Sequence, residues 1–294
     1  MNRIFFISLV VLSASFAGCK TPARKKPGSI PRDAEIQKIA GGFRFTEGPI
    51  ADVRGNVYFT DIPNNKIHII FLDGALATFM ENSGGANGLY FDENANLLAC
   101  QGGDRQLVSI DPDGKVTVLA DKFNGKPLNS PNDLWIDLKG GVYFTDPRYG
   151  RTDDMFQNGE HVYYLTPDRK KLIRVIDDMV RPNGIIGTPD GKRLYVADLS
   201  GHKTFRYRIN PDGTLTEKKL FINTGSDGMT IDIKGNVYIT TNTVEVYNLK
   251  GKLLGKIGVP EWPSNVTFGG PEKDTLFITA RTSVYSIKTN TKGL

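Results

Sequence analysis

The chain has 294 residues, with 39% hydrophobic residues, 23% charged residues, 2 Cys and 3 His. This length and apolar content are enough for a sizeable core, so they exclude a disulfide-stapled miniprotein and a disordered chain. The scarcity of Cys and His argues against a Cys/His zinc site, so we expect oxygen ligands for any bound metal. The only membrane-like run lies at the N-terminus and is too short to span a bilayer, which excludes a multi-pass membrane protein.

The net charge of +5 is unevenly distributed along the chain. Residues 1–32 contain six basic residues and no acidic residue, whereas residues 33–294 contain 31 basic and 32 acidic residues. The part expected to fold is therefore close to neutral. We expect no nucleic acid partner, because proteins that bind nucleic acids present a basic surface.

A targeting segment is the first feature along the chain. Residues 4–12 are almost wholly apolar, and mostly small residues follow them up to Cys19. Residues 1–18 resemble a bacterial lipoprotein signal peptide, in which the next Cys is lipidated and becomes the mature N-terminus. Phe16 stands where such signals usually have Leu, and the alternative is an ordinary secretory signal with an incidental Cys19. Residues 19–34 then form a basic, Pro-containing tether.

The rest of the chain, residues 35–294, contains six repeats. Each repeat has a polar residue, an apolar stretch, a Gly-containing turn and a β-rich strand, followed by a third strand and usually a fourth. The polar residues that open the repeats, called the ring residues below, are Glu47, Asn87, Asn132, Asn183, Asp227 and Asn265. They are 40, 45, 51, 44 and 38 residues apart, a spacing typical of propeller blades.

These repeats predict an all-β fold, a six-bladed β-propeller, because strand-length runs are dense and no 3.6-residue helical period occurs. The sixth repeat stops after its third strand, at Lys288. The spare strand expected at residues 35–39 then supplies the outer strand of the last blade, which closes the ring and protects a sheet edge.

The ring residues indicate a metal site. The first strand of each propeller blade lines the central channel, so we expect these six side chains to converge at one mouth. Two carboxylates and several amides suit a hard divalent cation, and Ca²⁺ accepts six to eight oxygens in loose geometry. The alternative is that the Asn-Gly and Asp-Gly pairs are present only as turn residues, because they accept unusual backbone angles.

The motifs around the ring residues resemble the senescence-marker-protein/gluconolactonase family, the regucalcin-like six-bladed lactonases. The matching segments are Phe45-Thr46-Glu47-Gly48-Pro49, Leu128-Asn129-Ser130-Pro131-Asn132-Asp133, residues 143–150, Arg181-Pro182-Asn183-Gly184 and Ser226-Asp227-Gly228. The resemblance implies one divalent cation held by Glu47, Asn183 and Asp227. The all-oxygen ligand set favours Ca²⁺ over Zn²⁺, Mg²⁺ or Mn²⁺. The resemblance also implies that Asn132 contacts the substrate or completes the metal shell.

The reaction implied by the resemblance is the opening of a sugar-type lactone whose carbonyl is polarised by the cation. A carboxylate beside the cation can take a proton from the attacking water, and we expect Asp227 to be this base. Loops after the second strands are expected to shape the substrate pocket, through Gln101, Arg148 and Tyr149. The mouth of the second blade departs from the family, because relatives often have Cys-Glu-His-Gly where this chain has residues 100–103, Cys-Gln-Gly-Gly.

Two other functions share the same scaffold. One is a metal-dependent hydrolase of phosphotriesters or aryl esters, and the other is a non-enzymatic propeller, tethered to the cell envelope, that binds a glycan or a protein at its mouth. A binding propeller does not need acids at both Glu47 and Asp227, so their presence favours an enzyme. We expect a monomer whose partner is a small-molecule lactone, with Cys100 as a buried strand thiol.

Membrane attachment through Cys19 is the first testable prediction. We expect an exported bacterial protein, lipid-anchored in the cell envelope on the periplasmic side or at the surface, with no other membrane contact. Cys19→Ser should release the protein into the soluble fraction or block its processing, as measured by fractionation and the mass of the mature chain. Unchanged processing and membrane fractionation of the variant would contradict the lipoprotein interpretation.

Overall fold

The computed structural model describes residues 26–150 and 153–294. The predicted signal peptide and Cys19 lie outside the described residues. Within them the chain forms 26 strands and one short 3₁₀ helix, η1 (Ile62–Asn64). None of the helices in this part of the chain is long and apolar enough to cross a bilayer.

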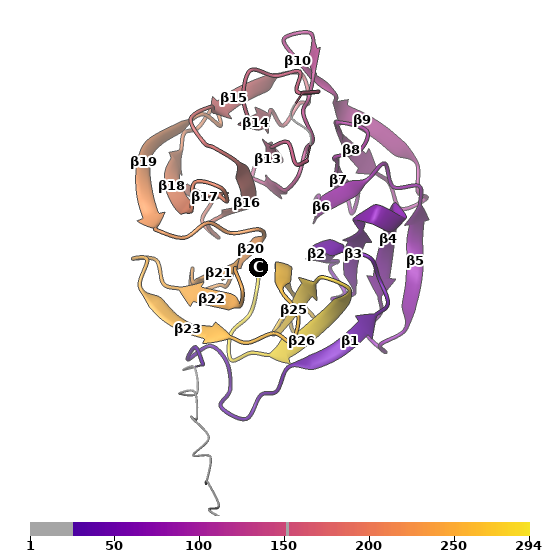
Figure 1. Cartoon of the computed structure of the whole chain (residues 1–294), viewed down its shortest axis with the longest axis vertical. Helices are drawn as coiled ribbons and strands as arrows, with labels where there is room; N and C mark the ends of the chain where they lie inside the picture. The colour runs from indigo at the N-terminus through magenta and orange to yellow at the C-terminus, as the bar shows by residue number, and fades with distance from the viewer. Residues whose placement is uncertain (1–25, 151–152) are drawn as a thin grey trace, which may run out of the picture.

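The strands form six four-stranded antiparallel sheets arranged around one axis, which confirms the predicted six-bladed β-propeller (Figure 1). In each blade the first strand lies nearest the axis. The blades, from inner to outer strand, are as follows. Blade 1 has β2 (Thr46–Ala51), β3 (Val57–Asp61), β4 (Lys66–Ile70) and β5 (Leu76–Glu81). Blade 2 has β6 (Ala86–Phe91), β7 (Leu97–Gln101), β8 (Gln106–Ile110) and β9 (Val116–Ala120).

The remaining blades repeat this order. Blade 3 has β12 (Leu134–Ile136), β13 (Val142–Asp146), β14 (His161–Leu165) and β15 (Leu172–Ile176). Blade 4 has β16 (Pro182–Gly187), β17 (Arg193–Asp198), β18 (Lys203–Ile209) and β19 (Leu215–Ile222). Blade 5 has β20 (Met229–Ile231), β21 (Val237–Thr240), β22 (Val244–Tyr247) and β23 (Leu253–Ile257). A small hairpin, β10 (Lys122–Phe123) and β11 (Lys126–Pro127), connects blades 2 and 3.

Blade 6 is built from both ends of the chain, as predicted. Its inner strands are β24 (Pro263–Gly269), β25 (Thr275–Ala280) and β26 (Ser283–Lys288), and its outer strand is β1 (Gln37–Gly41). The register pairs Gln37 with Ser286 and Gly41 with Ser283. The closing strand therefore lies two residues further along the chain than expected, and the outer edge of β26 is covered.

Part of the segment expected as a tether packs against the propeller. Ile30 is buried among apolar residues of blades 5 and 6. The Lys26 ammonium donates hydrogen bonds to the carbonyls of Arg32 and Ala34, and the Asn290 N–H donates to the Ser29 carbonyl at 2.7 Å. Contacts with the folded domain thus begin before residue 35.

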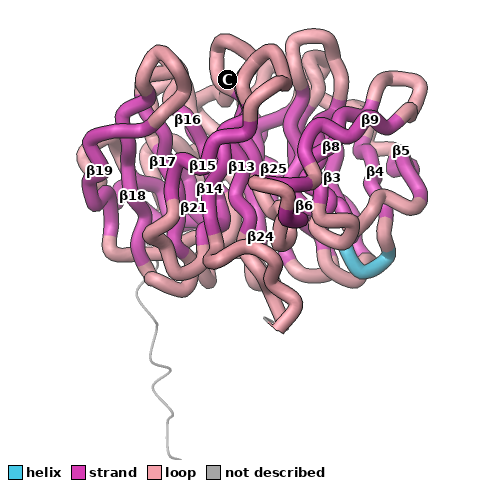
Figure 2. Tube along the Cα trace, turned by 90° about the horizontal axis from the view of Figure 1, so that it is seen from above, coloured by secondary structure: helices cyan, strands magenta, loops and turns pink. Residues whose placement is uncertain are grey.

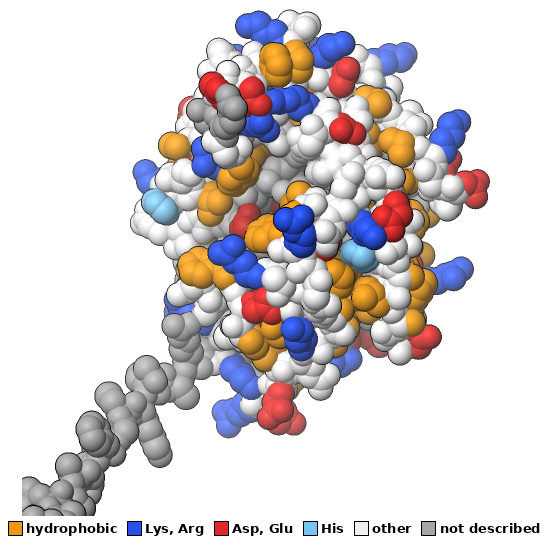
Figure 3. Space-filling model, turned by 45° about the vertical axis from the view of Figure 1, so that its right-hand side comes forward, with side chains coloured by type: hydrophobic (Ala, Val, Ile, Leu, Met, Phe, Trp, Pro, Cys, Tyr) orange, Lys and Arg blue, Asp and Glu red, His pale blue; other side chains and the backbone are white. Residues whose placement is uncertain are grey.

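The core lies between neighbouring blades, where the alternating apolar side chains of facing sheets interlock. Its largest fully buried side chains are mostly aromatic and come from second and third strands, such as Tyr143, Tyr163 and Tyr195. Cys100 is a fully buried free thiol on β7, as expected. On the face shown in Figure 3, basic and acidic side chains are interspersed rather than gathered into one patch.

Glycines allow the six inner strands to approach one another closely around the axis. A Cβ added at Gly184 would lie 2.5 Å from the Asp227 backbone oxygen, and one added at Gly228 would lie 1.9 Å from Asn265 Cγ. Neither glycine has a positive φ, whereas Gly48 does. Turn geometry alone therefore does not explain the Gly after most ring residues, because the next blade occupies the space of a side chain.

The two ends of the channel differ. In Figure 2 the η1 turn and the C-terminus lie on opposite faces of the disc. The ring residues lie toward the η1 face, whereas the other end narrows to a cavity of about 70 Å³ lined by Ile50, Ile186 and Leu294. The Gly293 N–H donates to the Lys273 carbonyl at 2.9 Å, which holds the C-terminal residues across this end.

Gly184→Ala tests the close approach of the inner strands. The added methyl group must displace the backbone of blade 5, so we expect the free energy of unfolding to fall by about 1–3 kcal/mol. Gly258→Ala is the matched control, because no atom lies within 4 Å of the Cβ position there. Urea denaturation of the two variants measures the difference, and equal stability would show that the inner strands can separate at little cost.

Candidate active site at the channel mouth

Local irregularities of the inner strands direct the ring residues toward the axis. The pairing of first and second strands shifts register between Glu47 and Ile50, between Ala86 and Leu89, and between Pro182 and Ile185. Such β-bulges bend a strand and redirect its side chains. In blades 3 and 5 the ring residue instead lies two residues before the inner strand begins, at Asn132 and Asp227.

Aspartates at the ends of the second strands hold the chain that leads into each first strand. The Asp61 carboxylate accepts hydrogen bonds from the backbone N–H groups of Arg44 and Phe45, at 3.1 to 3.3 Å. The carboxylates of Asp146 and Asp198 bind the equivalent N–H pairs of blades 3 and 4. These three residues are structural, and they fix the backbone just before the ring residues.

Glu47 is a buried carboxylate that connects the first and last blades. Its side chain is 3% exposed, and Oε2 accepts hydrogen bonds from the Gly48 N–H at 2.8 Å and from Asn265 Nδ2 at 3.1 Å. Burial raises the pKa of Glu47 well above its usual range, and the negative charge of Asp227 raises it further. A proton or a cation is therefore needed to stabilise this side chain at neutral pH.

Asn183 and Asp227 form the neighbouring part of the site. Asn183 Nδ2 donates to Asp227 Oδ1 at 2.7 Å and to the Tyr149 hydroxyl. Burial raises the pKa of Asp227 to about 6, while the Asn183 hydrogen bond and the charge of Arg281 oppose this rise. The Arg181 guanidinium lies 5.0 Å from the centre of the Tyr149 ring and holds it over the mouth. The structure thus brings the predicted residues Glu47, Asn183, Asp227 and Tyr149 together.

Asp133 is a third carboxylate of this site, and it is not among the residues predicted from the sequence. Its side chain is 8% exposed, and burial raises its pKa to about 7. The Leu134 N–H donates to its Oδ1 at 2.9 Å, and its negative charge contributes to the raised pKa of Glu47. The sequence signal that could have identified Asp133 is its position directly after the ring residue Asn132. Asn265, a ring residue that is not among the three proposed cation ligands, donates its hydrogen bond to Glu47.

Other predicted substrate-binding residues make contacts within the protein. Asn132 is 7% exposed, and its carbonyl accepts the Gly88 N–H at 2.7 Å, which joins blades 2 and 3. Gln101 is 3% exposed, and its Oε1 accepts a hydrogen bond from Gln106 Nε2 at 2.6 Å. The Gln101 side-chain amide therefore helps to hold the β7–β8 hairpin of blade 2 together.

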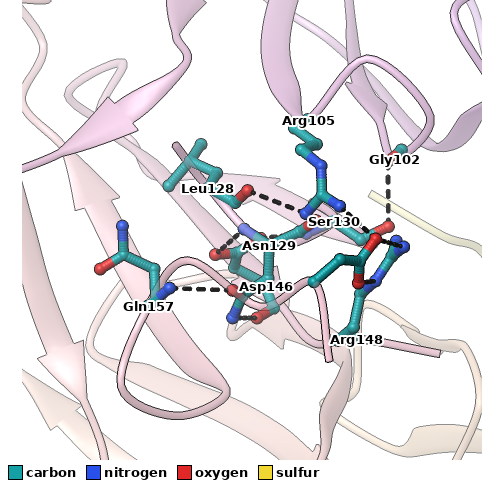
Figure 4. A network of polar contacts seen from close by, with 9 residues as sticks. Gly102, Arg105, Leu128, Asn129, Ser130, Asp146, Arg148 and Gln157 are labelled. Atoms are coloured by element: carbon teal, nitrogen blue, oxygen red, sulfur yellow. Dashed lines mark hydrogen bonds and ion pairs between the residues drawn. The ribbon is translucent and has the colours of Figure 1, made fainter. Parts of the chain in front are cut away.

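Arg148 lies in an ionic network at the rim of the mouth (Figure 4). Its Nε donates to Asp154 Oδ1 at 2.8 Å and its Nη2 to Asp154 Oδ2 at 2.5 Å. Arg105 binds the same carboxylate at 2.7 Å and the Asn129 carbonyl at 2.5 Å. This network anchors the loop between β13 and β14, and it occupies the Arg148 guanidinium, which the sequence suggested for substrate binding.

The donor set at the mouth suits an oxygen-coordinated cation in type. Within residues 26–150 and 153–294, no group of three or more His, Cys, Asp and Glu side chains is close enough to hold a metal ion. The available donors are mixed, namely the carboxylates of Glu47 and Asp227 with the amide oxygen of Asn183. Because Asp227 raises the pKa of Glu47, a positive charge between them would relieve their repulsion.

A cavity of about 770 Å³ adjoins this site on the side of blades 4 to 6. Asp227 lies on its wall, together with residues that include His202, Trp262 and Arg281. Figure 3 views this face obliquely and shows it hollowed near the axis. The volume lies within the range of ligand pockets for small molecules, so the site can hold a substrate larger than a single ring.

Fold and mouth together define a six-bladed propeller with a buried acidic site that opens at one end of its channel. The chain belongs to the SMP-30/gluconolactonase/LRE-like family, whose profile matches residues 45–282. It is 32% identical to a gluconolactonase from Zymomonas mobilis over 297 aligned positions, which cover 88% of this chain and 82% of that protein. The relatives identify the chain as an enzyme, a lactone hydrolase, and they favour neither alternative function.

Solved structures agree with this assignment. A gluconolactonase from Xanthomonas campestris superposes with a TM-score of 0.83 at 28% identity, over 90% of this chain and 95% of that one. Regucalcin from Agrobacterium tumefaciens, a calcium-binding protein, superposes with a TM-score of 0.76 at 20% identity, over 89% of this chain and 96% of that one. The likeness to regucalcin shows that this chain and regucalcin share the propeller fold.

Glu47→Gln tests the electrostatic cost of the mouth. The raised pKa means that the folded chain favours protonated Glu47, so stability falls as the pH rises above the unfolded-state value of about 4.3. In the presence of a chelator at pH 7.5, the variant should therefore be more stable than the parent, because it carries no buried negative charge at this position. The difference should shrink at pH 5, because a lower pH favours the protonated form of Glu47.

Chemical denaturation at the two pH values measures this effect. The exposed Glu93→Gln is the control and should leave stability unchanged at both pH values, because Glu93 lies on the surface. Lower stability of Glu47→Gln at pH 7.5 under chelation would show that the carboxylate is not strained by burial.

Proposed function

We propose that this protein is a metal-dependent hydrolase that opens sugar-type lactones at its channel mouth, with Ca²⁺ as the metal. The observation that carries the proposal is the pair of carboxylates, Glu47 and Asp227, enclosed with Asn183 in a chain whose relatives include gluconolactonases. These side chains come from blades 1, 4 and 5, so the complete site exists only in the closed propeller.

Glu47, Asn183 and Asp227 would hold the cation. Bound there, a divalent ion supplies Lewis-acid polarisation of the lactone carbonyl and stabilises the negative charge that develops on its oxygen. All the proposed ligand atoms are oxygens, which favours Ca²⁺ over Zn²⁺. Mg²⁺ and Mn²⁺ are the other candidates. The calcium-binding regucalcin supports this choice, because it shares the propeller.

Asp227 is the proposed general base. Asn183 Nδ2 orients its carboxylate, and a pKa of about 6 leaves it deprotonated at neutral pH while close to the range useful for proton transfer. It takes a proton from the water that attacks the lactone carbonyl carbon. The same group then returns the proton to the ring oxygen as the ester C–O bond breaks, which yields the open hydroxy acid.

Residues around the carboxylates place the substrate. The Tyr149 hydroxyl is fixed by Asn183, and its ring is held by Arg181, so it forms a stable side of the mouth. Arg181 is itself fixed by Glu160 through two hydrogen bonds of 3.1 and 3.2 Å. Asn132 remains the proposed contact to a substrate hydroxyl. Gln101 and Arg148 would act on the substrate indirectly, by shaping the rim.

The location and assembly of the enzyme are further parts of the proposal. The small residues before Cys19 and the basic segment after it support a lipid anchor in the cell envelope. The near-neutral folded part supports a catalytic domain that touches the membrane only through this anchor. We propose that the enzyme acts as a monomer, since all proposed site residues belong to one chain.

Three substitutions separate metal binding from proton transfer. Glu47→Gln removes charge from the cation site, so it should weaken metal affinity and regain activity in excess Ca²⁺. Asn183→Ala should behave similarly but more mildly, because it removes a neutral oxygen. Asp227→Asn keeps an oxygen but loses the base, so lactone turnover should fall by about 10²-fold or more and excess metal should not restore it.

The measurement is hydrolysis of glucono-1,5-lactone against Ca²⁺ concentration, with the surface variant Asp113→Asn as the control. Asn132→Ala should raise KM more than it weakens metal binding. Full recovery of Asp227→Asn in excess metal would show that Asp227 is only a ligand. Turnover of an organophosphate or aryl ester faster than any lactone would favour the alternative hydrolase.

A further inference from the structure

Within residues 26–150 and 153–294, the cavity beside Asp227 contains an arginine whose charge is not neutralised by an ion pair. Arg281 lies in the two-residue hairpin between β25 and β26, is exposed, and lines the cavity with Trp262 and His202. Among the residues that the structure describes, no carboxylate lies within ion-pair distance of its guanidinium. The central carbon of its guanidinium lies 5.9 Å from the centre of the Phe45 ring.

The other arginines of the mouth, unlike Arg281, form ion pairs with carboxylates. Arg105 and Arg148 share Asp154, and Arg181 binds Glu160. Each of these three therefore has a structural partner that holds a loop of the rim. The Arg281 guanidinium has no carboxylate partner of this kind among the described residues, so its charge is available to a ligand in the cavity.

Nearby acids are already engaged by other groups. The Glu261 carboxylate accepts hydrogen bonds from the Thr282 N–H at 2.9 Å, the Tyr285 hydroxyl at 2.8 Å and the Ser283 hydroxyl. Glu245, which also lines the cavity, is bound by Lys256 and Tyr247. Asp227 is the remaining acid on the wall, and it is bound to Asn183.

The backbone fixes Arg281 relative to the proposed catalytic residues. Its carbonyl accepts the Thr46 N–H at 2.8 Å, and Thr46 directly precedes Glu47. Its φ of 46° lies in the left-handed region, at a hairpin position where Gly, Asn or Asp is usual. An arginine in this conformation lowers the stability of the fold relative to a glycine. This cost points to a function for the Arg281 side chain.

We propose that Arg281 is a specificity-determining residue that binds an anionic substituent of the lactone, a carboxylate or a phosphate. This inference rests on the proposed lactonase function and names the substrate class of the same site. The guanidinium can bind either anion through two parallel hydrogen bonds, and the exposed Trp262 offers an apolar surface to the carbon skeleton between the anion and the ring. The cavity of about 770 Å³ has room for such a substituent.

Matched lactones test this proposal. Glucaro-1,4-lactone carries a carboxylate where glucono-1,4-lactone has a hydroxymethyl group, and glucono-1,5-lactone 6-phosphate is paired with its neutral parent. We expect the parent enzyme to prefer at least one anionic member by about 10-fold or more in kcat/KM. Arg281→Gln should lower kcat/KM for the preferred anion by about 10- to 100-fold and for the neutral lactone by less than about 3-fold.

Two further variants sharpen the comparison. Arg281→Lys keeps the charge but lacks the planar fork, so it should give an intermediate loss. Arg44→Gln is the control, because Arg44 is an exposed arginine on the same face that does not line the cavity. It should leave the ratio of anionic to neutral turnover unchanged. The carboxylate and phosphate pairs show which anion the cavity prefers.

Calorimetric binding of the open-chain products separates this inference from the proposed function. Glucarate or gluconate 6-phosphate should bind the parent more tightly than gluconate, and Arg281→Gln should remove the difference, even if neither lactone is hydrolysed. Equal loss for anionic and neutral lactones would overturn the proposal, because Arg281 would then act through the pKa of Asp227. Absence of any anion preference in both turnover and binding would also overturn it.

Discussion

The close packing of the six inner strands is the constraint on which the rest of this structure depends. Gly184 and Gly228 leave no room for a side chain between adjacent blades, so the ring residues beside them are brought to one small mouth. Larger residues there would widen the channel and separate Glu47, Asn183 and Asp227. The glycines after the ring residues resemble turn signals in the sequence, but in the structure they set the distances between the charged side chains of the mouth.

Enclosing carboxylates at such a mouth has an electrostatic cost that the fold offsets only partly. Glu47, Asp133 and Asp227 all have raised pKa values, mainly because of burial. Their direct hydrogen-bond donors include the amides of Asn183 and Asn265, and the charge of Arg281 acts on Asp227 without an ion pair among the described residues. Little positive charge lies in direct contact with these carboxylates, so the proposed cation, or a proton, would relieve the repulsion among them.

The fold and the composition of the ring were predictable from the sequence, because the repeats follow a regular spacing and each begins with a polar residue. The closing strand was predictable because the sixth repeat lacks a fourth strand. Asp133 was missed because it follows a ring residue instead of sharing its position. The contacts of Arg148 and Arg281 depend on how loops from different blades face each other. Periodicity within one chain carries no information about such contacts.

Because β1 and β26 share one blade, the two ends of the chain must meet before the sheet is complete. The hydrogen bond between Asn265 and Glu47 spans 218 residues, so this part of the site cannot form during synthesis of the first five blades. Contacts of such long range slow folding, and an incomplete ring exposes a strand edge. Assembly of the mouth is thus a late event in folding, and a chain truncated within blade 6 would lose both its closure and its chemistry.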